Sequence, residues 1–166
     1  LATAEPLTIN GTGISNGGAL INSGAAASYS GAVTLGSNSH IGTTGNITLS
    51  GLVSGGFSLT KVGSGVLIFT GVNPYSGTTT ISNGTLALGA ANRISNSSNI
   101  ILSGGTFSTG TSTGYAETVG TLSLQSNSTI ALGTGSHILN FGASNGVSWT
   151  GSTVLTITGW TGTIGN

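Results

Sequence analysis

The sequence predicts an all-β protein, a single-stranded right-handed parallel β-helix (β-solenoid), on three observations. Short apolar clusters alternate with polar residues in the period of two that β-strands show. Pairs of Gly, Asn and Ser separate the clusters, as tight corners require. The polar residues are small and almost all uncharged, which suits stacked rungs because charges repeated about every 4.8 Å would repel one another. We expect about seven to eight rungs, at roughly 20–25 residues a rung.

The predicted strands follow one another along the whole chain, each about four residues long. No stretch has the 3.6-residue period of an amphipathic helix. Pairs such as Asn83-Gly84 and Gly104-Gly105 mark the turns between strands. The strands are expected at 7–9, 32–35, 46–49, 57–60, 66–69, 79–81, 85–88, 100–102, 121–124, 129–132, 138–141 and 154–157.

A loose internal repeat favours a solenoid over other all-β folds. The segment 82–89 resembles 126–133, which indicates that one structural unit recurs along the chain. The Asn-Gly pairs also suit two-residue hairpins, so an antiparallel β-sandwich is the alternative fold. Residues 1–166 are expected to form a single β-solenoid domain.

Formal charge is confined to four residues, Glu5, Lys61, Arg93 and Glu117. We expect the two cations on corners or outer faces, in solvent. Because the net charge is zero, no nucleic-acid partner is expected. No apolar run approaches the ~20 residues of a membrane-spanning helix, so no membrane insertion of this segment is expected. Cysteine is absent, which excludes disulfides and thiolate-bound metals.

Residues 57–89 carry a specific motif. The run L-T-K-V-G-S-G-V-L-I-F-T-G-V-N-P-Y-S-G-T-T-T-I from Leu59, continued by G-T-L-A-L-G at 84–89, closely resembles the autotransporter-associated β-strand repeat. The resemblance implies a parallel β-helix in a large secreted passenger protein of bacteria, and it implies no catalytic residue. The chain is therefore expected to be a segment of a longer passenger, a processed product, or a protein exported by another route. The structural repeat positions are Leu59, Gly63, Gly65, Leu67, Gly71, Tyr75, Gly77, Thr79, Gly84, Leu86, Leu88 and Gly89.

Catalytic chemistry finds little support among the side chains, and we expect no enzyme. Glycosidases need two carboxyl groups about 5–9.5 Å apart. The chain offers only Glu5 and Glu117, which a stack of rungs should hold far apart. The segment 110–114 matches G-x-S-x-G by letters, but that motif needs a following helix and an acid–histidine pair. His40 and His137 lack carboxylate or thiolate support, so no metal and no cofactor are expected.

The function predicted from these features is that of a structural or adhesive module, extracellular or on the bacterial cell surface. Uncharged rungs without evident caps favour head-to-tail self-association into filaments, or stacking on neighbouring repeats. Tyr29, Trp149 and Trp160 are candidate surface aromatics for a glycan or cell-surface ligand. The alternative is that Tyr75 packs a corner of the repeat and Trp160 caps the last rung.

Threonine-rich clusters raise a third function, an ice-binding solenoid. Such a face needs outward threonines in a regular array over several rungs. The threonines at 78–80 and 153–158 recur irregularly in the sequence, which argues against it.

Overall fold

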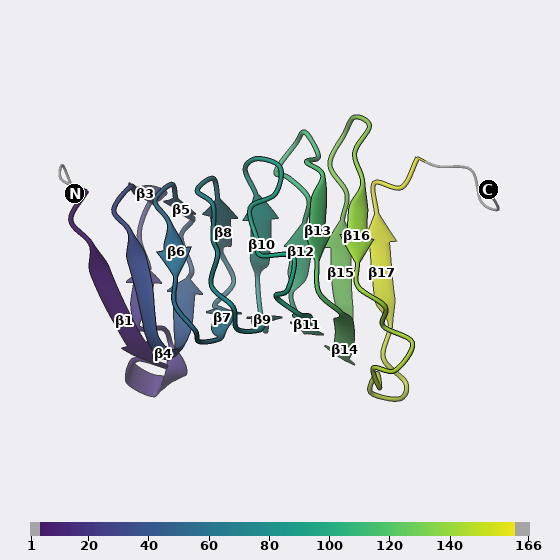
Figure 1. The fold of residues 1–166 in the computed structure, drawn as a ribbon, viewed down its shortest axis with the longest axis horizontal. Coiled ribbons are helices and arrows are strands. Elements are labelled where there is room, and N and C mark those ends of the chain that lie inside the picture. The colour runs from purple at the N-terminus through teal and green to yellow at the C-terminus, as the bar shows by residue number, and fades with distance from the viewer. Residues whose placement is uncertain (1–3, 162–166) are drawn as a thin grey trace.

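The computed structural model describes residues 4–161. It is an elongated stack of short strands, with β1 at one end and β17 at the other (Figure 1). The first sheet has the order β1 (Leu7–Gly11), β4 (Val33–Thr43), β7 (Leu59–Val62), β9 (Thr79–Ile81), β11 (Ile100–Ser103) and β14 (Leu122–Ser126). Two further strands, β2 (Leu20–Asn22) and β6 (Val53–Ser54), also pair with β4.

A second sheet stacks beside the first. Its order is β3 (Ala27–Tyr29), β5 (Ile47–Leu49), β8 (Val66–Phe69), β10 (Thr85–Leu88), β12 (Thr106–Ser108), β15 (Ser128–Ala131) and β17 (Leu155–Thr158). A third face holds β13 (Glu117–Val119) and β16 (Leu139–Phe141), and a single bridge joins Asn73 to Ile94. The short 3₁₀ turn η1 (Ile14–Asn16) lies in the first rung.

All pairings between these strands are parallel. The predicted β-solenoid is therefore confirmed, and the antiparallel β-sandwich is wrong. Asn-Gly pairs such as Asn83-Gly84 turn the chain from one sheet to the next instead of closing hairpins, because β9 and β10 belong to different sheets. Within residues 4–161, no helix is long and apolar enough to cross a bilayer.

The number of rungs is smaller than predicted. The stack has about 6 turns, not seven to eight. The rungs that pair β4 with β7, β5 with β8 and β7 with β9 have a 20-residue spacing, as in the hydrogen bond from the Val66 amide to Asn46. The first rung is longer, with 26 residues between Gly11 and Ser37, and the last has 27 between Asn127 and Val154. Most of these extra residues lie in loops, including η1. The pairing of β15 with β17 keeps its register, whereas that of β1 with β4 shifts between Ile9 and Gly11.

The core is a set of columns along the stack. In the second sheet, Leu67, Leu86, Phe107 and Ile130 occupy the same register in successive rungs and are all buried. The residues that alternate with them on the same strands, such as Thr85, Thr106 and Thr129, are only half-buried. The period of two in the sequence thus separates an apolar interior from a hydroxyl-rich exterior.

Asparagine side chains join successive rungs at several corners. The Oδ1 atom of Asn38 accepts the Ser58 amide at 2.9 Å, and that of Asn99 accepts the Thr121 amide at 2.9 Å. Asn46 and Asn127 do the same for Val66 and Val154, at 3.1 and 2.8 Å. In each case the amide lies at the first residue of a strand or directly before it, so the asparagine oxygen supplies an acceptor where the backbone enters β7, β8, β14 or β17.

Candidate functional site

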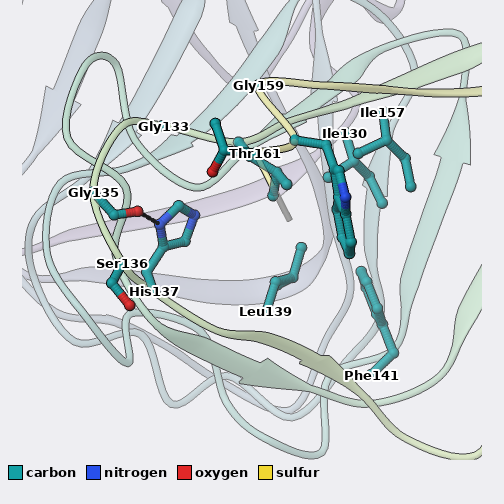
Figure 2. Close-up of a pocket in the computed structure, with 12 residues that line it drawn as sticks. Ile130, Gly133, Gly135, Ser136, His137, Leu139, Phe141, Ile157, Gly159 and Thr161 are labelled. Carbon is teal, nitrogen blue, oxygen red and sulfur yellow. Dashed lines mark hydrogen bonds between the residues drawn. The ribbon is translucent and has the colours of Figure 1, made fainter. Parts of the chain in front are cut away.

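A hollow opens at the β17 end of the stack, where the interior of the solenoid reaches the surface (Figure 2). Its volume is about 530 Å³. One wall is apolar, and the opposite end is polar, with His137 beside Gly135 and Ser136. The lining residues are Ile130, Leu132, Gly133, Gly135, Ser136, His137, Leu139, Phe141, Ile157, Gly159, Trp160 and Thr161.

The apolar wall continues the core columns. Ile157 stands directly above Ile130 in register, yet Ile157 is 49% exposed whereas Ile130 is 3% exposed. The difference arises because Ile130 is covered by the β17 rung, while β17 is the last strand of its sheet. Trp160 is 60% exposed beside it. The hollow is therefore the inner surface of the last described rung, chemically suited to the inward side chains of another rung.

His137 connects the loop 133–137, which forms the polar end of the hollow, to the neighbouring rung by hydrogen bonds. Its Nε2 lies 2.9 Å from the Thr109 hydroxyl, and its Nδ1 lies 3.0 Å from the Gly135 carbonyl. The Thr109 hydroxyl also accepts the Gly133 amide at 2.9 Å. With Nδ1 protonated, His137 donates to Gly135 and accepts from Thr109, so both of its ring nitrogens serve the loop.

The three candidate surface aromatics lie in different environments. Trp160 lines the hollow, and Trp149 is 45% exposed with its indole N–H donating to the Leu122 carbonyl at 3.2 Å. Tyr29 is not at the surface: it is 6% exposed, and its hydroxyl donates to the Glu5 carbonyl. Its ring faces inward because Tyr29 pairs with Leu49, a core position of the next rung. Tyr29 is therefore excluded as a surface contact.

The expectation for Lys61 is wrong. Lys61 is fully buried, and it occupies a core column because it pairs with Ile41 and Ile81. Its ammonium donates to the carbonyls of Val62, Gly63 and Asn83 at 2.9, 2.6 and 3.1 Å. Burial lowers the pKa of Lys61 to about 8.

Glu117 is also buried, at 1% exposure. One carboxylate oxygen, Oε2, accepts the amides of Arg93 and Ile94 at 2.6 and 3.3 Å, where the third face lacks a regular strand. Burial raises the pKa of Glu117, although these hydrogen bonds oppose the shift. Arg93 is half-buried, and its guanidinium donates to the Ala91 and Thr70 carbonyls.

Tyr75, one of the repeat positions, is buried and takes part in a network of hydroxyl groups. Its oxygen lies 2.6 Å from the Thr79 hydroxyl, which lies 2.9 Å from that of Ser98. Ser98 in turn donates to the Gly77 carbonyl at 2.7 Å. The network ties one corner of the repeat to the next rung, and burial raises the pKa of Tyr75 well above its usual range.

The repeat motif therefore has a structural explanation. Leu59, Leu67, Leu86 and Leu88 are fully buried core residues. Gly63 has a φ of +76°, and a Cβ there would lie 2.4 Å from the Thr43 carbonyl oxygen of the neighbouring rung. A side chain is thus excluded at this corner by both conformation and space.

The two histidines and the segment 110–114 are the remaining candidates from the sequence. Among residues 4–161, no three His, Cys, Asp or Glu side chains come together in a group that could hold a metal. His40 is on β4, and its Nδ1 lies 3.4 Å from the Asn16 carbonyl. His137 lies between β15 and β16, toward the opposite end of the stack from β4 (Figure 1). The segment 110–114 is a loop between β12 and β13, not a strand-to-helix turn.

The second sheet carries a column of threonines that the sequence spacing concealed. Thr85, Thr106, Thr129 and Thr156 stand in the same register of four successive rungs. Thr85 and Thr106 also line a shallow groove on this outer face, together with Ser108. The intervals between the threonines are irregular in the sequence because the loops differ in length.

Residues 59–88 match the family model of the passenger-associated-transport-repeat. The resemblance drawn from the motif is thus confirmed. No curated protein matches the chain. No solved structure matches it either.

Proposed function

We propose that this chain is a structural segment of a secreted or surface-exposed bacterial passenger protein. The observation that carries the proposal is the continuous parallel stack, with the passenger-associated-transport-repeat forming its central rungs. Every motif position with a buried side chain serves packing, and the two carboxylates lie in different rungs, Glu5 beside Tyr29 and Glu117 on β13. The module acts by its shape, as a rod with few charges and no catalytic role.

The β17 end supports a second part of the proposal, that molecules of this chain stack end to end. Ile157 and Trp160 expose apolar surface there, and among residues 4–161 β17 is the last strand of its sheet. At the other end, Leu7 on β1 and Leu20 on β2 pair with the buried core residues Val33 and Ile41 but are themselves only half-buried. Parallel strand edges and apolar interiors at both ends favour association in one direction, head to tail.

Negative-stain electron microscopy with light scattering tests the stacking. We expect concentration-dependent rods or fibres of the native chain, and their loss in Ile157→Lys, which places a charge in the hollow. Thr80→Lys, on the outer face of a central rung, is the matched control and should associate normally. Monodisperse monomers of the native chain at high concentration would refute self-stacking and leave the structural role within a longer passenger.

The threonine column supports a second candidate function, ice binding. Four hydroxyl and methyl pairs repeat about every 4.8 Å along the outer face. The neighbouring column offers no second row of exposed threonines, since it holds Ala87, Ser108 and Ala131, of which Ala87 and Ser108 are buried. Thermal hysteresis and inhibition of ice recrystallisation would be measured for the native chain and Thr106→Lys. The absence of both activities in the native chain would eliminate this candidate.

A further inference from the structure

The corner between β9 and β10 brings a reactive pair of residues beside the buried lysine. Asn83 is exposed and is followed by Gly84, whose φ is +63°. The Gly84 amide N–H donates to the Oδ1 atom of Asn83 at 2.7 Å. The Gly84 nitrogen therefore lies next to the side-chain amide of Asn83, whose Cγ is the atom that it would attack.

Lys61 contacts the Asn83–Gly84 peptide unit from the interior of the solenoid. Its ammonium donates to the Asn83 carbonyl oxygen at 3.1 Å, and this carbonyl is conjugated to the Gly84 nitrogen. Loss of the Gly84 amide proton places negative charge on that oxygen. A cation held beside it stabilises this charge, as hydrogen-bond donors do in an oxyanion hole. The corner thus combines a positioned nucleophile with a group that makes its N–H more acidic.

We propose that Asn83-Gly84 is a site of spontaneous modification, at which Asn83 becomes aspartate or isoaspartate through a succinimide, promoted by Lys61. Solvent hydroxide takes the Gly84 amide proton, and the nitrogen forms a bond to Asn83 Cγ. The Cγ–Nδ2 bond then breaks, and Nδ2 leaves as ammonia after taking a proton from water. Water opens the imide at either carbonyl carbon, which gives the two acids. The reaction uses only this chain and water.

The modification would change a chain whose formal net charge is zero. It adds one carboxylate at a corner where the Lys61 ammonium already lies close to the backbone. The isoaspartate product also adds one methylene group to the backbone. Gly84 is sensitive to such a change because its carbonyl accepts the Thr106 amide of the next rung at 2.8 Å.

Other Asn-Gly pairs in the chain provide internal comparisons. The Gly11 amide donates to the Ser37 hydroxyl at 2.8 Å, and the Gly17 amide donates to the Ile14 carbonyl at 2.9 Å. Both nitrogens are thereby directed away from the preceding asparagine. The pair Asn145-Gly146 is exposed, but no cation assists it. Lys61 and Arg93 are the two Lys or Arg residues of the chain, and their side chains bond to the Asn83 and Thr70 carbonyls instead. Asn83 should therefore react fastest.

The test is incubation of the full chain at neutral pH in ¹⁸O-labelled water, followed by proteolysis and mass spectrometry of each Asn-Gly peptide. We expect conversion at Asn83 to be about tenfold faster than at Asn145. Lys61→Met should bring the Asn83 rate to within about twofold of the Asn145 rate, and Lys61→Arg should retain the difference.

Two results would overturn the proposal. One is equal or slower conversion at Asn83 than at Asn145 in the native chain, a comparison that requires no variant. The other is an unchanged Asn83 rate in Lys61→Met, with Asn145 conversion and circular dichroism also unchanged. That result would show that the lysine only packs the corner.

Discussion

Lys61 is held inside the solenoid by three backbone carbonyls, so its contribution to stability depends on pH. Its pKa is lowered from 10.5 to about 8 by burial. The folded chain therefore releases this proton at a pH where the unfolded chain still holds it. The free energy of unfolding should rise with pH from about 8 to about 9.5, below the range in which tyrosines ionise.

Urea unfolding of the native chain and Lys61→Met across this pH range checks the prediction. The variant should be less stable near pH 7 by about 1–3 kcal/mol, because it leaves buried carbonyls without a donor. Its stability should also lack the rise with pH. Parallel pH profiles of the two proteins would contradict the assigned pKa direction.

Glu117 gives the opposite pH dependence. Its pKa is raised above 4.5 by burial, so the folded chain holds this proton at a pH where the unfolded chain has lost it. Stability should therefore decrease as the pH rises through the interval just above 4.5. Glu117→Gln removes the charge and keeps an oxygen acceptor for the Arg93 and Ile94 amides.

The corresponding experiment compares Glu117→Gln with Glu117→Ala by urea unfolding from acidic to neutral pH. The Ala variant should lose about 1–3 kcal/mol, because two buried amides lose their acceptor. The Gln variant should lose less and should show no pH-dependent decrease in the interval above 4.5. Equal losses in both variants would mean that the carboxylate charge, and not the acceptor oxygen, stabilises this corner.

At the scale of the elements, corners need side chains to complete the hydrogen bonding between rungs. Asn99→Ala removes the acceptor of the Thr121 amide and should destabilise the fold by about 1 kcal/mol. Asn96→Ala, at an exposed position of the preceding loop, is the control and should change stability by less than about 0.5 kcal/mol. Thermal unfolding followed by circular dichroism measures both. An equal effect of the two substitutions would remove the asparagine corner bond as a stabilising element.

The sequence predicted strands best where several apolar residues alternate. Strands at 66–69 and 85–88 were predicted and are present. The strand β12 was missed because Phe107 is its one large apolar residue, and β13 was missed because it begins with Glu117. Their pairing with neighbouring rungs, which local composition does not reveal, makes them strands. The threonine column was hidden for the same reason, since unequal loops obscure the register.

Charged residues were the second source of error. Lys61 was expected in solvent because lysine is seldom buried. The alternation itself contained the correct signal, since Lys61 lies two residues after Leu59 and so shares its inward face. The hollow at β17 could not be predicted from the sequence. Its lining comes from two segments, 130–141 and 157–161, and their relative position is set by the three-dimensional stacking of the rungs.

At the scale of the whole molecule, the scarcity of charge governs the response to salt. With four charged residues and zero net charge, stability and end-to-end stacking should depend little on ionic strength. Light scattering of the same sample at low and high sodium chloride concentration tests this. A strong loss of association with salt would indicate that the ends attract one another through ion pairs and would contradict apolar stacking.

The 20-residue spacing from β4 to β7 and from β7 to β9 also gives the rod a unit of length. Strand Leu59–Val62 pairs with Val33–Thr43 on one side and with Thr79–Ile81 on the other, and the register is the same in both pairings. A duplicated copy of residues 59–78 would therefore meet matching neighbours above and below. Each such insertion should lengthen the rod by about 4.8 Å. The length of the solenoid is therefore proportional to the number of repeats that it contains.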